Sequence, residues 1–564
     1  MTKTILWFTI ILSFIFMTGC IDKISITEKS DHWKYQEEVS KSTYNRQGFS
    51  NNSGINPSSP GALYDTNTLQ ENIGFQVGAD QDMMLFRDNI EKGHIPSLET
   101  ITYNGIFSDY HFQQPSGECE TMFCPLVDYG QVDNENWIQI SLGSNIKDED
   151  FQRPPTNFVL VIDKSGSMGG ALSQYYYENT QDYIYESDLC DTQNELYFAP
   201  GKKCISQEDK QIFIDDYTEI SKQSRMEFAM QAMSKMLDKL REDDRIGIVL
   251  YDDSAYIAHE LIKVENIDKS SLKKHLKSVR DGGGTNMESG MKKGLSLFDD
   301  DMKSGYQNRV LFITDAMPNM GDYSAGGLAN MVKDASEDNI YFSFFGVAVD
   351  FQQQFVQKIG KFEGNNYFYI SDAWEFSQRI VDEFDYNFFP MIFNLKMNID
   401  NEDNIEKVYG LDNHKNELMS INTLFPTPPK TEGHRGSIIL LKLKEQIQEN
   451  INIQVSYKEY TGKEVETSQE IKIDNKPANT SMIKGVNLVK YTDALKESIQ
   501  ERDISILENI KEKLKLKEEI FQGDDKKVFE KEIKTIDKLI KLINNGEQVK
   551  QDYNPDRNKR NLEK

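Results

Sequence analysis

The sequence predicts a multidomain α/β protein. A doubly wound, mostly parallel sheet is inserted in or flanked by a β-sandwich, and a helical segment follows at the C-terminal end. Between residues 156 and 388, apolar runs alternate with helical stretches, which is typical of a parallel sheet covered on both faces. Residues 391 to 475 hold strand patterns without helices, as in an antiparallel sandwich. A chain of 564 residues is also long for one hydrophobic core.

The composition excludes some functional classes. Lys and Arg number 64 against 91 Asp and Glu, a formal net charge of −27, so the chain lacks the basic surface that nucleic acid binding needs. Hydrophobic residues make up 38% and charged residues 27%, a balance that suits a globular protein better than a membrane channel.

The first residues differ from the polar remainder. Ile5 to Met17 form an apolar run after Lys3, too short to span a membrane but suited to a signal peptide. The run ends in Met17-Thr18-Gly19-Cys20, which resembles the lipobox of bacterial lipoproteins. The resemblance implies removal of residues 1–19, lipidation of Cys20, and anchoring to a bacterial cell membrane at the periplasmic face or the cell surface. The alternative is an ordinary signal peptide with a chance cysteine.

Four cysteines remain after Cys20. Because an exported protein meets oxidising conditions, we expect local disulfides, Cys119–Cys124 and Cys190–Cys204. A zinc site of four cysteines is the alternative, although the spacing lacks a CxxC pair.

Residues flanking the α/β region have simpler patterns. Residues 20–70 are polar and are predicted to form a flexible tether. Residues 71–150 are predicted to form an N-terminal domain with a helix over Met83–Glu91 and a strand over Trp137–Leu142.

The α/β domain is predicted over residues 151–388. Ser224 and Glu227 form a capping box before a methionine-rich helix. Four apolar runs are predicted as buried strands: Phe158–Ile162, Ile246–Tyr251, Val310–Ile313 and Ile340–Val349.

The β-sandwich is predicted over residues 389–480. Strands from residues 100–150 could complete it, and the α/β domain would then be an insertion in the sandwich. Residues 481–550 are predicted as helices broken at Gln522–Asp525, and residues 551–564 as a polar tail. The predicted sandwich strands are Phe393–Ile399, Ser437–Leu443, Ile451–Tyr457 and Glu466–Ile473.

Oxygen-bearing side chains follow two of the buried strands. Phe158–Ile162 leads into Asp163-Lys164-Ser165-Gly166-Ser167, and Val310–Ile313 leads into Thr314-Asp315. Gly282-Gly283-Gly284-Thr285 precedes a further helix. In an open α/β sheet, ligands bind at the carboxyl ends of the strands. Two carboxylates and three hydroxyls suit a hard cation, Mg²⁺ or Mn²⁺ better than Ca²⁺.

This pattern resembles the metal-ion-dependent adhesion site of von Willebrand factor A (VWA) domains, which have a Rossmann-like sheet. The matching residues are Asp163, Ser165, Ser167, Thr285 and Asp315. The resemblance implies that Ser165, Ser167 and Thr285 contact the cation, and that the two aspartates bind it or hold its waters. It also implies a protein ligand whose Asp or Glu completes the coordination.

The sequence departs from the family in one place. Residues Gly169 to Lys222 separate the serines from the first helix, which usually follows them closely. Tyrosines are common in binding loops because they bury a large, rigid surface at low entropic cost. We expect this insert either to select the partner or to cover its own domain. The tyrosines that are candidates for partner binding are Tyr175, Tyr176, Tyr177, Tyr183 and Tyr185.

These observations favour a cell-envelope protein with an adhesion or scaffold role. An assembly subunit of an envelope complex is the alternative. A metal-dependent hydrolase is a weaker one, because no general base or nucleophile accompanies the candidate ligands in the sequence. No catalytic residue is therefore predicted.

Overall fold

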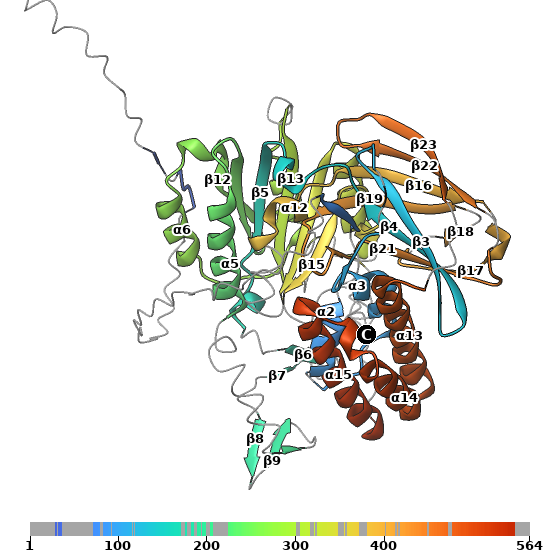
Figure 1. Cartoon of the computed structure of the whole chain (residues 1–564). Coiled ribbons are helices and arrows are strands. Elements are labelled where there is room, and N and C mark those ends of the chain that lie inside the picture. The colour runs from blue at the N-terminus through green and yellow to red at the C-terminus, as the bar shows by residue number, and fades with distance from the viewer. Residues whose placement is uncertain are drawn as a thin grey trace, which may run out of the picture.

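The computed structural model arranges the chain in an α/β domain, a β-sandwich and a helical module (Figure 1). No helix within the described ranges is long and apolar enough to cross a membrane. The residues that the structure describes are 29–30, 32–35, 72–78, 83–91, 93–115, 117, 119–170, 175–177, 182–184, 189–192, 195–198, 204–206, 224–299, 305–315, 321, 324–347, 355, 358–370, 381–400, 402–411, 414–415, 418–447, 450–471 and 477–546. The predicted signal peptide, Cys20 and the C-terminal tail lie outside these ranges.

The α/β domain is built on a six-stranded sheet in which β5 is central. β5 pairs in parallel with β11 on one side and with β13 on the other, and its eight residues are all buried. β12 is the antiparallel edge strand. These pairings confirm the predicted doubly wound, mostly parallel sheet. In spatial order the strands are β12 (Ala255–Lys263), β11 (Arg245–Tyr251), β5 (Thr156–Asp163), β13 (Gln307–Thr314), β14 (Ile340–Val347) and β15 (Asn366–Ile370).

Helices cover both faces of this sheet, as the hydrophobic strands require. Side chains of α5 (Arg225–Lys239), α6 (Lys269–Ser278) and α12 (Phe384–Asn387) pack on one face. Side chains of α7 (Met287–Leu295) and α9 (Ala325–Glu337) pack on the other. The predicted capping box starts α5, where the hydroxyl of Ser224 accepts from the backbone N–H of Glu227 at 3.0 Å.

The β-sandwich confirms that the α/β domain is an insertion. β4 precedes the α/β domain in the chain and pairs with β21, which follows it. The strands within residues 74–77 and 124–143 complete the sandwich and share one core with the strands that follow the α/β domain. One sheet contains β1 (Gly74–Val77), β19 (Leu418–Thr427), β16 (Ile392–Ile399), β22 (Ile451–Glu459), β23 (Glu464–Ile471) and, beside β19, β18 (His414–Lys415). The other contains β17 (Ile405–Tyr409), β21 (Ile438–Leu443), β4 (Glu135–Gly143) and β3 (Cys124–Val132).

The helical module is joined to the α/β domain by the predicted helix α2 (Met83–Glu91). Met84 of α2 packs in the core beside β15, whereas Phe86 packs among the C-terminal helices. Arg87 is buried and pairs with both Glu532 of α15 and Asp109. α2 therefore connects two cores that are far apart in the sequence. The other elements of this region are α3 (Tyr103–Phe107), α13 (Thr480–Glu501), α14 (Ile504–Lys515), α15 (Gly523–Asn544) and the β2 (His111–Phe112)–β20 (His434–Arg435) pair.

Part of the predicted tether lies against the α/β domain. The backbone N–H of Lys34 donates to Ala258 O of β12 at 2.8 Å. The rings of Trp33 and His275, on α6, stack with centroids 5.2 Å apart. The prediction of a flexible tether over residues 20–70 did not anticipate these contacts, because a short aromatic segment among polar residues has no periodicity.

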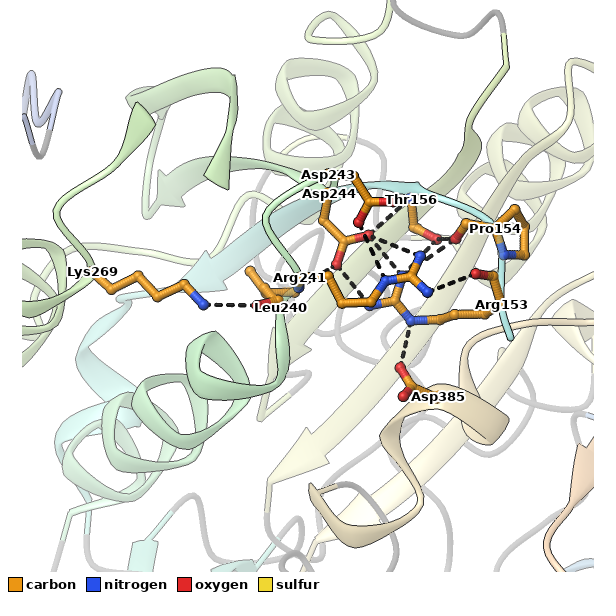
Figure 2. A network of polar contacts seen from close by, with 9 residues as sticks. All are labelled: Arg153, Pro154, Thr156, Leu240, Arg241, Asp243, Asp244, Lys269 and Asp385. Atoms are coloured by element: carbon orange, nitrogen blue, oxygen red, sulfur yellow. Dashed lines mark hydrogen bonds and ion pairs between the residues drawn. The ribbon is translucent and has the colours of Figure 1, made fainter. Parts of the chain in front are cut away.

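A buried ion pair closes the end of the sheet opposite the carboxyl ends of the parallel strands (Figure 2). The guanidinium of Arg153, just before β5, donates two hydrogen bonds of 2.7 Å to Asp244, which precedes β11. Asp244 also accepts from the backbone N–H of Thr156 at 3.0 Å. Arg153 further pairs with Asp385 of α12 at 2.6 Å. This network ties the point where the chain enters the α/β domain to the helix where it leaves.

We predict that Asp244→Asn lowers the free energy of unfolding by about 3–5 kcal/mol, because it leaves the buried Arg153 without its main counter-ion. Asp385→Asn is the matched control. Its side chain is 51% exposed, so we expect a loss below about 1 kcal/mol. Urea unfolding followed by circular dichroism measures both, and equal losses would show that the bidentate pair has no special role.

Candidate metal site

The candidate site lies at the carboxyl ends of β5 and β13. Asp163 is the last residue of β5, and Asp315 directly follows β13. Because these strands are parallel neighbours, their carboxyl ends meet at one edge of the sheet. Ser165 and Ser167 follow in a tight turn, with a 3-10 helix over Gly166–Gly169.

Hydrogen bonds join four of the five predicted ligands in a continuous chain. Asp163 Oδ1 accepts from the backbone N–H of Ser165 at 2.9 Å. The hydroxyl oxygens of Ser165 and Ser167 lie 3.0 Å apart. Ser167 Oγ then donates to Asp315 Oδ1 at 3.0 Å. The structure therefore joins Asp163 and Asp315 at one site, although they are 152 positions apart in the sequence.

Thr285 reaches the same edge on the glycine loop. The backbone N–H of Gly166 donates to Gly283 O at 3.0 Å, and that of Gly282 donates to Lys164 O at 2.8 Å. Thr285 itself is buried, two residues before α7. These two backbone hydrogen bonds hold the loop of Thr285 against the loop of the serines.

Neighbouring side chains orient Asp163. Its second oxygen, Oδ2, accepts from the hydroxyls of Thr314 at 2.7 Å and of Tyr251 at 2.9 Å. Burial, and then the charge of Asp163, raise the pKa of Tyr251 well above its ordinary value, so this phenol remains a hydrogen-bond donor. The position of the Asp163 carboxylate is therefore determined by donors from two neighbouring strands.

The two carboxylates form a buried like-charge pair. Burial and, next, repulsion from Asp315 raise the pKa of Asp163 to about 7. A divalent cation among these oxygens would relieve that repulsion, since a nearby opposite charge favours the ionised form. Two carboxylates and three hydroxyls also suit Mg²⁺ or Mn²⁺ by donor type. The residues present therefore fit such a cation.

Other side chains brace the glycine loop. Asp253 Oδ1 accepts from the backbone N–H of Gly284 at 2.7 Å, and Lys164 pairs with Asp252 Oδ2 at 2.5 Å. Within the described ranges, no group of three or more His, Cys, Asp or Glu side chains is placed to hold a metal ion. The candidate set therefore depends on its hydroxyls as well as on its two carboxylates.

The insert begins and ends beside the site. The backbone N–H of Arg225 donates to Gly170 O at 2.9 Å, so the chain returns to the point where it left. The backbone forms short strands in between, and Tyr175, Tyr176, Tyr177 and Tyr183 lie on them, whereas Tyr185 lies outside the described residues. The strands are β6 (Tyr175–Tyr177), β7 (Asp182–Ile184), β8 (Leu189–Thr192), β9 (Glu195–Phe198) and β10 (Cys204–Ser206).

The structure contains one of the two predicted disulfides, and the other stays a prediction. Cys119 and Cys124 form the predicted disulfide, with Cα atoms 5.9 Å apart, so a zinc site using all four cysteines is wrong. Cys190 and Cys204 both pair in register with Tyr197, from opposite sides of β9. Two strand spacings separate their backbones, about 10 Å, which exceeds the usual reach of a disulfide. Their pairing stays a prediction that requires these strands to shift.

Residues 212–383 match the von Willebrand factor type A domain, and the chain therefore contains a VWA domain. The match begins within the insert, so β5 and the Asp163–Ser167 loop lie outside it. The order of the sheet and the position of β5 at its centre extend the same fold to those residues.

Individual relatives are distant. Inter-alpha-trypsin inhibitor heavy chain H2 of Mus musculus is 21% identical over 141 residues, which is 24% of this chain and 15% of the relative. The uncharacterized protein YfbK of Escherichia coli is 25% identical over 170 residues, 30% of this chain and 29% of the relative. The chain thus spans less than a third of either relative's length. A solved structure of von Willebrand factor type A from Catenulispora acidiphila aligns with 70% of this chain and 84% of its own, at 12% identity and a TM-score of 0.38.

Sequence reasoning missed the residues that support the candidate ligands. Arg225 donates to Asp315 Oδ2 at 2.8 Å, and Tyr251 and Thr314 hold Asp163. A basic residue in the first turn of a helix is unfavourable for the helix dipole. The position of Arg225 directly after the capping Ser224 was therefore a signal that a nearby carboxylate compensates its charge. The role of Tyr251 needed the strand register, which places it beside Asp163.

We predict that Gly283→Ala lowers the free energy of unfolding by about 1–3 kcal/mol. Gly283 has a φ of +86°, and an added Cβ would lie 3.0 Å from Asp252 Cβ. Gly305→Ala is the matched control, because its φ is +75° but no atom lies within 4 Å of the added carbon. Chemical denaturation compares the two, and an effect no larger at Gly283 would contradict close packing of the loop.

Proposed function

We propose that the protein is a cell-envelope lipoprotein whose VWA domain binds a divalent cation and uses it to capture a protein partner. The cation is Mg²⁺ or Mn²⁺, and the partner presents an Asp or Glu carboxylate. The ligands are Asp163, Ser165, Ser167, Thr285 and Asp315. The observation that carries this proposal is the hydrogen-bonded chain from Asp163 through the two serines to Asp315.

The chemistry of the donors favours binding over catalysis. Hydroxyls are weak, neutral ligands, so a bound divalent ion would stay electrophilic and could take a further carboxylate as a ligand. The candidate set contains no histidine or thiol to act as a base or nucleophile. Asp163 already accepts three hydrogen bonds, which fix its carboxylate and favour a role in cation binding over proton transfer.

The predicted signal peptide and lipobox support a membrane anchor at Cys20. The described contact of Lys34 with β12 begins 14 residues after Cys20. At about 3.5 Å per extended residue, this distance keeps the VWA domain within about 50 Å of a lipid on Cys20. We propose on this ground that the domain acts close to the membrane surface.

The first test is thermal unfolding of the full chain without its signal peptide in EDTA, Mg²⁺, Mn²⁺ and Ca²⁺. A ligand that binds only the folded state at 100 times its Kd adds about 2.7 kcal/mol. For a domain of this size that raises Tm by about 5–10 °C. We predict this rise in Mg²⁺ and Mn²⁺, a smaller one in Ca²⁺, and its loss in the isosteric variant Asp163→Asn.

Asp253→Asn is the matched control for that test. It removes a carboxylate from the same edge of the sheet but keeps an acceptor for Gly284, so its Tm should still rise with Mg²⁺. Identical melting of the wild type in every buffer would contradict the proposed cation site.

A second test concerns the insert. Because Gly170 and Arg225 are already hydrogen-bonded, we predict that replacing residues 172–222 with a short Gly-Ser linker preserves folding and the rise of Tm in Mg²⁺. Crosslinking to an envelope fraction in Mg²⁺ and in EDTA should then show reduced cation-dependent capture. Capture equal to that of the wild type would show that the insert does not select the partner.

A further inference from the structure

Arg225 is a buried positive charge in direct contact with a candidate ligand. It is the first residue of α5, and its side chain has no exposed surface. Its Nη1 donates to Asp315 Oδ2 at 2.8 Å, and Asp315 is equally buried. The other oxygen of Asp315 accepts from Ser167 at 3.0 Å. Asp315 is therefore shared between the guanidinium and the serine turn.

Two physical costs oppose an arginine at this position. The amino end of a helix carries a partial positive charge, which disfavours a cation in the first turn. Removing a guanidinium from water costs several kcal/mol unless a counter-ion offsets it. Asp315 supplies that counter-ion. Because both groups are buried, water and dissolved salt screen the attraction between them only weakly.

We propose that Arg225 is a positioning residue that lowers the affinity of the empty site for a cation and makes the loaded site attract an acidic partner. This inference rests on the proposed function. Asp163, Asp315 and Arg225 together leave one net negative charge at the site when both carboxyls are ionised. With a divalent cation, the site would carry one net positive charge, which a single Asp or Glu from a partner neutralises.

Arg225 thereby couples the two binding events. Without it, a divalent cation would neutralise the site alone, and a partner's carboxylate would gain less from binding. With it, cation and carboxylate each strengthen the binding of the other, as any pair of coupled ligands must. The guanidinium also holds Asp315 Oδ2, so Oδ1 remains directed to the serine turn.

The test is isothermal titration of the full chain without its signal peptide with Mn²⁺ and Mg²⁺ alone. We expect Arg225→Met to bind either cation at least about tenfold more tightly than the wild type, since a buried positive charge near a divalent ion is removed. Arg225→Lys keeps the charge and should stay within about threefold of the wild type. Lys239→Met removes an exposed charge from the other end of α5 and should change nothing.

The outcomes distinguish the role of Arg225 from the proposed function. Affinity of Arg225→Met equal to or weaker than that of the wild type, with the wild type binding, overturns the role of Arg225 but leaves the proposed function standing. Binding by Arg225→Met and not by the wild type supports the role of Arg225 but contradicts cation binding by the wild type without a partner. No binding by either protein overturns both. If Arg225→Met does not fold in EDTA, recovery in Mg²⁺ that is lost on adding Asp163→Asn supports the inference, and failure to recover overturns it.

Discussion

The parallel pairing of β5 with β11 and β13 positions the candidate metal site. It buries all eight residues of β5 and brings the carboxyl ends of β5 and β13 to one edge of the sheet. Asp163 and Asp315 are consequently buried together, although their charges repel. This carboxylate pair accepts hydrogen bonds from the guanidinium of Arg225 and from three hydroxyls, those of Ser167, Tyr251 and Thr314.

The opposite end of the sheet holds the connections between the VWA domain and the β-sandwich. The chain enters and leaves the VWA domain through the β-sandwich, and the Arg153–Asp244 pair joins these connections to the start of β11. Its bidentate geometry and complete burial make it a strong contact. One end of the sheet is thus closed by a matched ion pair, whereas the other brings two carboxylates together beside one guanidinium.

The insert leaves the α/β domain and returns to it at one place. Its two ends meet at Gly170 and Arg225, so the insert does not have to span a distance between the serine turn and α5. A long closed loop costs little more entropy than a short one. A partner-binding surface could therefore change without disturbing the candidate ligands. Arg225 lies where the insert returns and also contacts Asp315, so the base of the insert adjoins the site.

Local sequence patterns were enough to predict the order of the main elements and the candidate ligands. Strand runs such as Phe158–Ile162 and the capping box at Ser224 are local patterns, because burial and capping follow from residues close in the chain. Contacts between residues far apart in the sequence emerge only in the folded chain: β4 with β21, α2 between two cores, and Arg225 on Asp315. These contacts depend on strand register and on the choice of buried counter-ion, which no local pattern records.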